Sequence, residues 1–100
     1  MAGEFQGKVA VITGGSRGIG REIAVDFAKG GAQTVIVSSS ADNLAAAAKT
    51  IAATGGAAPL AITADLRKLE GVQQVFNTVK EKFGRCDILV NSAGATKAGN

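Results

Sequence analysis

Short β-branched runs alternate with amphipathic helical patterns along the chain, and this alternation restricts its fold more than any other feature. Strands are predicted at residues 8–13, 34–37, 60–64 and 87–91, and helices at 18–29, 42–51 and 67–83. The strands are short and apolar, which is typical of a parallel sheet covered on both faces. Right-handed crossovers then predict an α/β fold with strand order 3-2-1-4, a Rossmann-type doubly wound parallel sheet in a three-layer α/β/α arrangement.

The helical patterns also predict which side chains face the sheet. These are Ile19, Ile23, Ala24, Phe27 and Ala28 in the first helix, Leu44, Ala47, Ala48 and Ile51 in the second, and Leu69, Val72, Phe76, Val79 and Phe83 in the third. Asp42 is the expected N-cap of the second helix, because a side-chain oxygen at this position can accept from a free helix N–H. Cys86, which opens the last strand, is expected to be a small buried side chain.

Composition excludes several classes of protein. The chain has no His and one Cys, so a Cys-rich zinc site, an internal disulfide and a histidine general base are excluded. The formal net charge of +3 is small and scattered, which argues against a nucleic-acid partner, and no apolar run is long enough for a membrane span. Residues 1–7 contain neither a basic nor an apolar stretch, so we expect no signal peptide and a reducing, cytoplasmic setting.

A glycine-rich turn joins the first strand to the first helix and reads Thr-Gly-Gly-Ser-Arg-Gly-Ile-Gly over residues 13–20. Glycine allows the backbone to approach a phosphate closely, and the free N–H groups of a helix N-terminus attract an anion. The spacing is G-x-x-x-G-x-G, which differs from the common G-x-G-x-x-G and from a Walker loop. A tight turn without a ligand is the alternative, but the position at the start of a β-α-β unit favours dinucleotide binding.

Residues near the end of the second strand bear on which dinucleotide is bound. An acidic residue about 20 positions after the turn binds the ribose 2′-hydroxyl of NAD and repels a 2′-phosphate. Ser38 and Ser39 stand at that place, and neither is acidic. Arg17 lies inside the turn, where a guanidinium can bind a phosphate bidentately. The sequence therefore favours NADP(H) over NAD(H), although Arg17 could also be a solvated surface charge.

Three motifs in order resemble the short-chain dehydrogenase/reductase family. They are the turn at residues 13–20, Asp65-Leu66 after the third strand, and Asn91-Ser92-Ala93-Gly94 after the fourth. The resemblance extends from about residue 5 to residue 99. Within the family, the sequence is similar to the 3-oxoacyl-carrier-protein reductase branch. The family's usual Asn-Asn-Ala-Gly is Asn-Ser-Ala-Gly here. Because Ser92 can still form hydrogen bonds, we expect the cofactor site to be modified and not lost.

The resemblance implies a role for each motif in holding the cofactor. Asp65 would accept from the adenine amino group with Leu66 beside it, although Asp65 could instead cap the third helix. Asn91, Ala93 and Gly94 would lie near the ribose on the nicotinamide side, although Asn91 could be only a hydrogen-bonding residue at a strand end. The residues implied at the pyrophosphate and its adjacent ribose are Gly14, Ser16, Gly18, Ile19 and Gly20.

The family's proton donor is missing from these residues. Carbonyl reduction by hydride transfer needs a proton donor near the carbonyl oxygen, and in the resembled family a Tyr, assisted by a Lys and a Ser, fills this role. This chain contains no Tyr, so no catalytic residue is predicted in it. The fourth strand would also be left as a bare apolar edge. We therefore expect residues 1–100 to be the N-terminal part of a single dinucleotide-binding domain, with the catalytic C-terminal part absent.

Three functional hypotheses follow from these residues. The first is an NADP(H)-dependent oxidoreductase that interconverts a ketone and a secondary alcohol, with a small carbonyl or alcohol substrate and, by resemblance, a homotetramer in the full-length protein. The second is a truncated or non-catalytic dinucleotide-binding module, which the missing Tyr favours. The third is an enzyme that uses another adenosyl cofactor, such as a methyltransferase, and Asn-x-Ala-Gly after the fourth strand argues against it.

Overall fold

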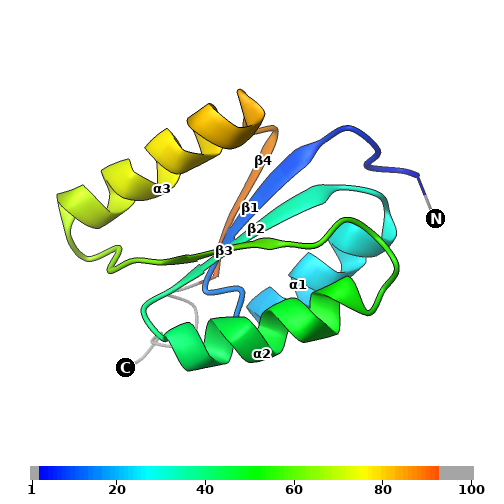
Figure 1. Cartoon of the computed structure of the whole chain (residues 1–100), viewed down its shortest axis with the longest axis horizontal. Coiled ribbons are helices and arrows are strands. Elements are labelled where there is room, and N and C mark those ends of the chain that lie inside the picture. Colours follow the sequence, from blue (N-terminus) through cyan, green and yellow to red (C-terminus); the bar gives the residue numbers. More distant parts are fainter. Residues whose placement is uncertain (1–2, 93–100) are drawn as a thin grey trace.

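The computed structural model describes residues 3–92, which form four strands and three helices in strict alternation. In chain order these are β1 (Val9–Thr13), α1 (Gly18–Lys29), β2 (Gln33–Ser38), α2 (Ala41–Ala52), β3 (Leu60–Thr63), α3 (Leu69–Phe83) and β4 (Ile88–Asn91). The strands are parallel and lie in the order β3-β2-β1-β4, as the sequence predicts. Helices α1 and α2 cover one face of this sheet and α3 covers the other, which confirms the three-layer arrangement (Figure 1).

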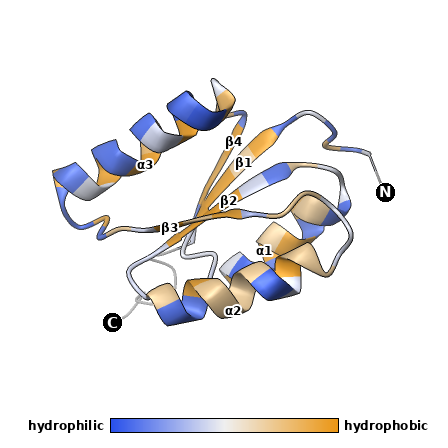
Figure 2. Cartoon of the chain, in the orientation of Figure 1, coloured by the Kyte–Doolittle hydropathy of each residue, from blue (hydrophilic) through white to orange (hydrophobic). Residues whose placement is uncertain are grey.

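Alternate residues of the central strands supply two separate cores, because successive side chains of a strand point to opposite faces. Ala10, Ile12 and Ile36 are fully buried against α1 and α2, while Val11 and Val35 are fully buried on the α3 side. The hydrophobic stripes of the helices turn toward the sheet and their polar residues turn outward (Figure 2). Burial on both faces explains why β1 and β2 read as continuous apolar runs.

The strand register places the carboxyl ends of all four strands at one edge of the sheet. Thr13, the last residue of β1, pairs with Val37 of β2 and with Asn91 of β4. On the outer side, Ser38 pairs with Thr63 of β3. The glycine-rich turn, the serines after β2, Asp65 and the Asn91 segment therefore all come together at this edge.

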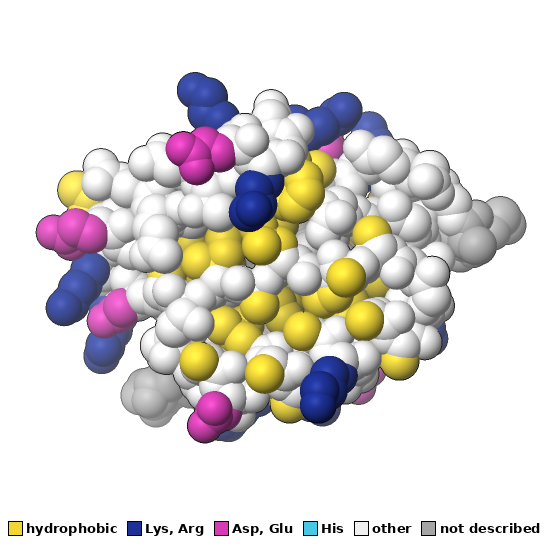
Figure 3. Space-filling view, viewed as in Figure 1, with side chains coloured by type: hydrophobic (Ala, Val, Ile, Leu, Met, Phe, Trp, Pro, Cys, Tyr) yellow, Lys and Arg dark blue, Asp and Glu magenta, His cyan; other side chains and the backbone are white. Residues whose placement is uncertain are grey.

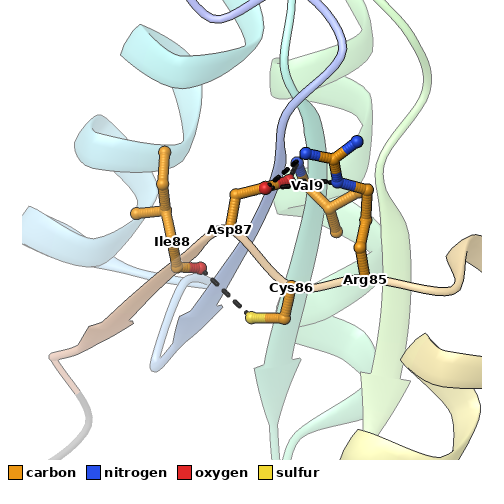
Figure 4. A network of polar contacts seen from close by, with 5 residues as sticks. All are labelled: Val9, Arg85, Cys86, Asp87 and Ile88. Atoms are coloured by element: carbon orange, nitrogen blue, oxygen red, sulfur yellow. Dashed lines mark hydrogen bonds and ion pairs between the residues drawn. The ribbon is translucent and has the colours of Figure 1, made fainter.

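At the opposite edge, Asp87 fastens the start of β4 to β1 (Figure 4). Its Oδ2 accepts from the Val9 N–H at 2.8 Å, and its own N–H donates to the Val9 carbonyl at 2.9 Å. The Arg85 guanidinium binds both oxygens of the carboxylate, with Nη2–Oδ1 at 2.7 Å and Nε–Oδ2 at 2.9 Å. The Arg85 hydrogen bonds, followed by the Val9 N–H, lower the pKa of Asp87. Cys86 is exposed beside this pair, so its predicted burial is wrong.

Other details of the helices also differ from the sequence predictions. The N-cap of α2 is Ser40 instead of Asp42, since the Ser40 Oγ accepts from the Asn43 N–H at 3.2 Å. In α3 the buried residues are Gly71, Val75 and Val79. The large hydrophobic residues Ile19, Leu69 and Phe76, predicted to face the sheet, are 68%, 69% and 37% exposed. Helix α3 is rolled so that its 71-75-79 row is buried: the prediction is confirmed for Val79 and for Phe83, which packs against the core, and is wrong for Leu69 and Phe76.

The β3 side of the molecule exposes part of the apolar interior. Hydrophobic side chains form a band across this face, between α3 and α2 (Figure 3). Strand β3 is an edge strand of the sheet within residues 3–92, so the two cores approach the surface there. Within the same residues, every helix is too short or too polar to cross a lipid bilayer.

Candidate cofactor site

A cleft of about 680 Å³ lies over the carboxyl ends of the strands, on the face that α3 covers. Such edges are where open α/β sheets bind their ligands. The cleft is lined by Thr13, Gly14, Val37, Ser38, Ser39, Ala64, Asp65, Leu66, Arg67, Val72, Val75, Phe76, Leu89 and Asn91. Polar groups from the strand ends therefore face apolar side chains of α3 and β4, a combination suited to a ligand with both a flat ring and charged groups.

The glycine-rich turn is held tightly between the strands. Gly14 has φ of +77°, a conformation that glycine adopts without strain, and its N–H donates to the Val37 carbonyl at 2.8 Å. A Cβ at Gly20 would overlap the Gly14 carbonyl oxygen and the Ser92 Oγ. Glycine is therefore required at position 20 for α1 to approach the turn and the end of β4.

The N-terminus of α1 has free capacity for an anion. Its N-cap, Arg17, is extended and makes no side-chain capping hydrogen bond, and the first turn has no acidic residue. The first N–H groups of a helix have no intrahelical partner, and together with the helix dipole they favour negative charge. By contrast, Ser40 caps α2. An uncapped helix start behind a glycine-rich turn fits the pyrophosphate of a dinucleotide.

Thr13, Asn91 and Ser92 form a small network that joins the ends of β1 and β4. The Thr13 hydroxyl donates to Asn91 Oδ1 at 2.9 Å, and the Ser92 hydroxyl donates to the Thr13 carbonyl at 2.7 Å. With the Asn91 oxygen accepting from Thr13, the NH₂ group of the same amide can donate to an acceptor on a ligand. Ser92, which stands where the family usually has Asn, holds the ends of β1 and β4 together through this hydrogen bond.

The end of β2 presents hydroxyl groups to the cleft. Ser38 and Ser39 line it, and Ser39 is exposed. The Ser38 Oγ accepts from the Ser40 N–H at 3.1 Å, which holds the short loop in place before α2 begins. Asp65 is the one acidic residue among the described residues that line the cleft, and its carboxylate is paired with Arg67.

Asp65 follows β3 and is tied to Arg67 by three hydrogen bonds. The Arg67 N–H and Nε both donate to Oδ1 at 3.0 Å, and Nη2 donates to Oδ2 at 3.1 Å. These bonds lower the pKa of Asp65 from 3.8 to about 2, with a smaller contribution from the charges of Arg67 and Lys68. The N-cap of α3 is Lys68, so Asp65 organises the turn before this helix and does not cap it.

The structure places the predicted site residues in two groups. Gly14, Ser38, Ser39, Asp65, Leu66 and Asn91 line the cleft together. Ser16, Arg17, Gly18, Ile19 and Gly20 continue the turn into α1, where Ser16 is buried while Arg17 and Ile19 are exposed. Ala93 and Gly94 lie outside the described residues.

Several cleft residues were not singled out from the sequence as part of a binding site. Thr13, Arg67, Val75 and Leu89 line the cleft, and Gly71 allows the backbone of α3 to lie against the Asp65 carbonyl, where a Cβ would overlap. A glycine inside an otherwise amphipathic helix was the available signal for this close approach. In residues 3–92 no group of three or more His, Cys, Asp and Glu residues is arranged as a metal site.

The comparison with known protein families agrees with this geometry. Residues 8–100 match the family described as short chain dehydrogenase. This chain belongs to the short-chain dehydrogenase family. Relatives of the chain in this family are named for different substrates.

Three relatives illustrate the range of the family. The 1,6-dihydroxycyclohexa-2,4-diene-1-carboxylate dehydrogenase of Pseudomonas putida is 41% identical, over 96% of this chain and 35% of its own length. The L-sorbose reductase of Gluconobacter frateurii, solved with NADPH and L-sorbose, is 46% identical with a TM-score of 0.87, over 94% of this chain and 36% of that one. A metagenomic short-chain oxidoreductase in complex with NADP is 35% identical with a TM-score of 0.81, over 86% of this chain and 38% of that one.

The chain spans about a third of the length of the curated relatives it matches. The high structural similarity over this third confirms the Rossmann-type fold of the short-chain dehydrogenases. The aligned part contains the glycine-rich turn and the ends of the first four strands.

Proposed function

We propose that this chain is the NADP(H)-binding part of a short-chain oxidoreductase that interconverts a ketone and a secondary alcohol. The observation that carries the proposal is the cleft at the carboxyl edge of the sheet, where Gly14, Ser38, Asp65 and Asn91 meet beside the uncapped start of α1. Membership of the short-chain dehydrogenase family and two relatives solved with NADPH or NADP support it.

In this proposal the cofactor lies along the edge of the sheet. The turn residues Gly14, Ser16, Gly18, Ile19 and Gly20 hold the pyrophosphate and the adjacent ribose with backbone N–H groups. Asp65 and Leu66 hold the adenine, and Asn91, Ala93 and Gly94 hold the ribose on the nicotinamide side. The nicotinamide supplies the hydride when it is bound, and the residues named here position it.

The preference for NADP(H) over NAD(H) rests on charge at the end of β2. A 2′-phosphate placed there meets the hydroxyl groups of Ser38 and Ser39, and the Asp65 carboxylate of the same cleft lining is neutralised by its ion pair with Arg67. Arg17 is exposed at the start of α1 and supplies a cation for the same phosphate.

The catalytic groups are proposed to lie in a further segment of polypeptide, because this chain has no Tyr to donate a proton. That segment would also form the substrate pocket, and by family resemblance the contacts of a homotetramer. A cytoplasmic location is proposed from the single Cys of the chain. The similarity to 3-oxoacyl-carrier-protein reductases remains a prediction from the motifs, since the relatives described above are named for other substrates.

The missing Tyr also supports a second candidate, a dinucleotide-binding module without catalysis of its own. The two candidates share the cofactor site and differ only in whether a Tyr and a Lys, spaced as in the family, accompany it. Ketone reduction by the longest natural polypeptide containing this sequence supports the oxidoreductase. NADPH binding with no turnover of any carbonyl substrate supports the module.

Isothermal titration of the chain with NADPH, NADH and S-adenosylmethionine tests the cofactor site directly. We expect NADPH to bind most tightly, NADH more weakly, and S-adenosylmethionine to fail as a competitor. Absence of NADPH binding at several hundred micromolar would contradict the proposal, and competition by S-adenosylmethionine would favour a methyltransferase.

A further inference from the structure

The Asp65 carboxylate is held by Arg67 in a single orientation. Arg67 donates its backbone N–H and its Nε to Oδ1, both at 3.0 Å, and its Nη2 to Oδ2 at 3.1 Å. A carboxylate has about four lone-pair positions. Two are used on Oδ1 and one on Oδ2, which leaves one acceptor position on Oδ2, in a residue that lines the cleft.

The backbone around Asp65 is fixed by other contacts. The Ala64 N–H donates to the Ser38 carbonyl at 3.0 Å, and the Lys68 N–H donates to the Asp65 carbonyl at 3.2 Å. Gly71 lies so close to the Asp65 carbonyl that a Cβ there would overlap it. Since the main chain is held independently of Arg67, the guanidinium is needed only to set the rotation of the carboxyl group.

We propose that Arg67 is a positioning residue that makes Asp65 select a base with an amino group, and so sets the preference of the site for adenine. The inference rests on the proposed dinucleotide function. An ionised carboxylate only accepts hydrogen bonds, so the free position on Oδ2 recognises a donor and repels a carbonyl oxygen. Adenine presents an amino group at its position 6, whereas hypoxanthine presents an oxygen at the same place.

The charges around the pair are consistent with this role. Hydrogen bonds from Arg67 lower the pKa of Asp65 from 3.8 to about 2. The carboxylate is ionised at neutral pH with or without Arg67, so the arginine acts on its orientation and not on its charge. The Arg67 side chain is 90% exposed, whereas that of Asp65 is 31% exposed, so the arginine acts from the solvent side of the carboxylate. Its removal leaves the apolar cores on both faces of the sheet intact.

Binding of two probes by the wild-type chain and by Arg67→Ala tests the proposal. The probes are NADP⁺ and nicotinamide hypoxanthine dinucleotide phosphate, which differ only at position 6 of the base. The wild type is expected to prefer NADP⁺ by roughly 10-fold or more, in keeping with one hydrogen bond to a charged group. In Arg67→Ala the ratio of the two dissociation constants is expected to fall to within about threefold, because the carboxylate rotates freely.

Arg67→Lys separates geometry from charge, because lysine keeps the cation but lacks the planar fork. The proposal expects this variant to lose the base preference as Arg67→Ala does. Arg85→Ala is the matched control, since it removes a guanidinium that binds Asp87 two residues away in the same manner at the opposite edge of the sheet. This control should leave the ratio unchanged.

The possible results separate the proposed dinucleotide binding from the proposed role of Arg67. If the wild type binds neither probe, the proposed function is overturned and Arg67 has no base to select. If the wild type discriminates and either Arg67 variant keeps the full ratio, only the role of Arg67 is overturned. Thermal unfolding by circular dichroism confirms that each variant is folded, and a carboxyl NMR titration of Asp65 supplies a second readout, because its pKa should rise toward 3.8 in Arg67→Ala.

Discussion

The Ser92 hydroxyl donates a 2.7 Å hydrogen bond to the carbonyl oxygen of Thr13, and the Ser92 N–H donates to the same oxygen at 3.1 Å. This double contact closes the end of β4 onto the end of β1. It also places the Ser92 Oγ where it would overlap a Cβ at position 20 in α1. A residue that departs from the family pattern therefore connects two of the three cofactor motifs.

Gly20→Ala should disturb this junction more than any other substitution of one methyl group. The added Cβ overlaps the Gly14 carbonyl, which is backbone, as well as the Ser92 hydroxyl. We expect a loss of about 1–3 kcal/mol in the free energy of unfolding and a large loss of NADPH affinity, because α1 must move away from the turn. Urea unfolding and titration calorimetry measure the two effects. Glu22→Ala, an exposed substitution in the same helix, should change neither.

Arg17→Ala should separate the two nicotinamide cofactors. If the guanidinium binds the 2′-phosphate, its removal weakens NADPH binding by roughly 10- to 100-fold, the value of a charge-assisted contact, and leaves NADH binding nearly unchanged. Titration calorimetry with both cofactors measures the ratio. Lys29→Ala removes an exposed positive charge from the last turn of the same helix and serves as the control. Equal losses for NADPH and NADH would remove Arg17 from the proposed phosphate site.

The order of elements and their approximate extents were predictable from the sequence, because periodicity and glycines mark them locally. Gly30 and Gly84, for example, stand as C-caps directly after α1 and α3. The α2 N-cap was predicted two residues late. Both Ser40 and Asp42 are good caps, and only the loop after β2 decides which side chain reaches a free N–H.

The side-chain contacts across the site were less predictable, because they depend on how the helices pack against the sheet and on side-chain rotamers. Sequence spacing placed Phe76 toward the sheet, but the roll of α3 buries Val75 instead. The Arg67–Asp65 fork depends on side-chain rotamers, which local sequence does not specify. The meeting of Asp65 with the glycine-rich turn, by contrast, follows from parallel strands having their carboxyl ends at one edge.

Stability should fall in acid partly through Asp87. Arg85 and the Val9 N–H lower the pKa of this carboxyl in the folded protein. Its contribution is therefore present above the unfolded-state pKa of about 4 and is lost as the pH falls toward the lower folded-state pKa. Asp87→Asn should reduce the difference in unfolding free energy between pH 7 and pH 3, measured with urea. Asp26→Asn, at an exposed site in α1, is the control, and an unchanged pH dependence in Asp87→Asn would refute the assignment.

Val75→Ala and Phe76→Ala test the observed roll of α3. Val75 is 1% exposed within the core on the α3 side, whereas Phe76 is 37% exposed at the cleft. Removing two buried methyl groups should lower the free energy of unfolding by about 1–3 kcal/mol, since the transfer and cavity contributions add. Phe76→Ala removes far more atoms, yet it should lower stability less, because over a third of the residue already meets solvent and the space it leaves opens into the cleft, so that no closed cavity forms. Urea unfolding of both variants gives the comparison, and a larger loss for Phe76→Ala would mean that the helix presents the face expected from sequence spacing.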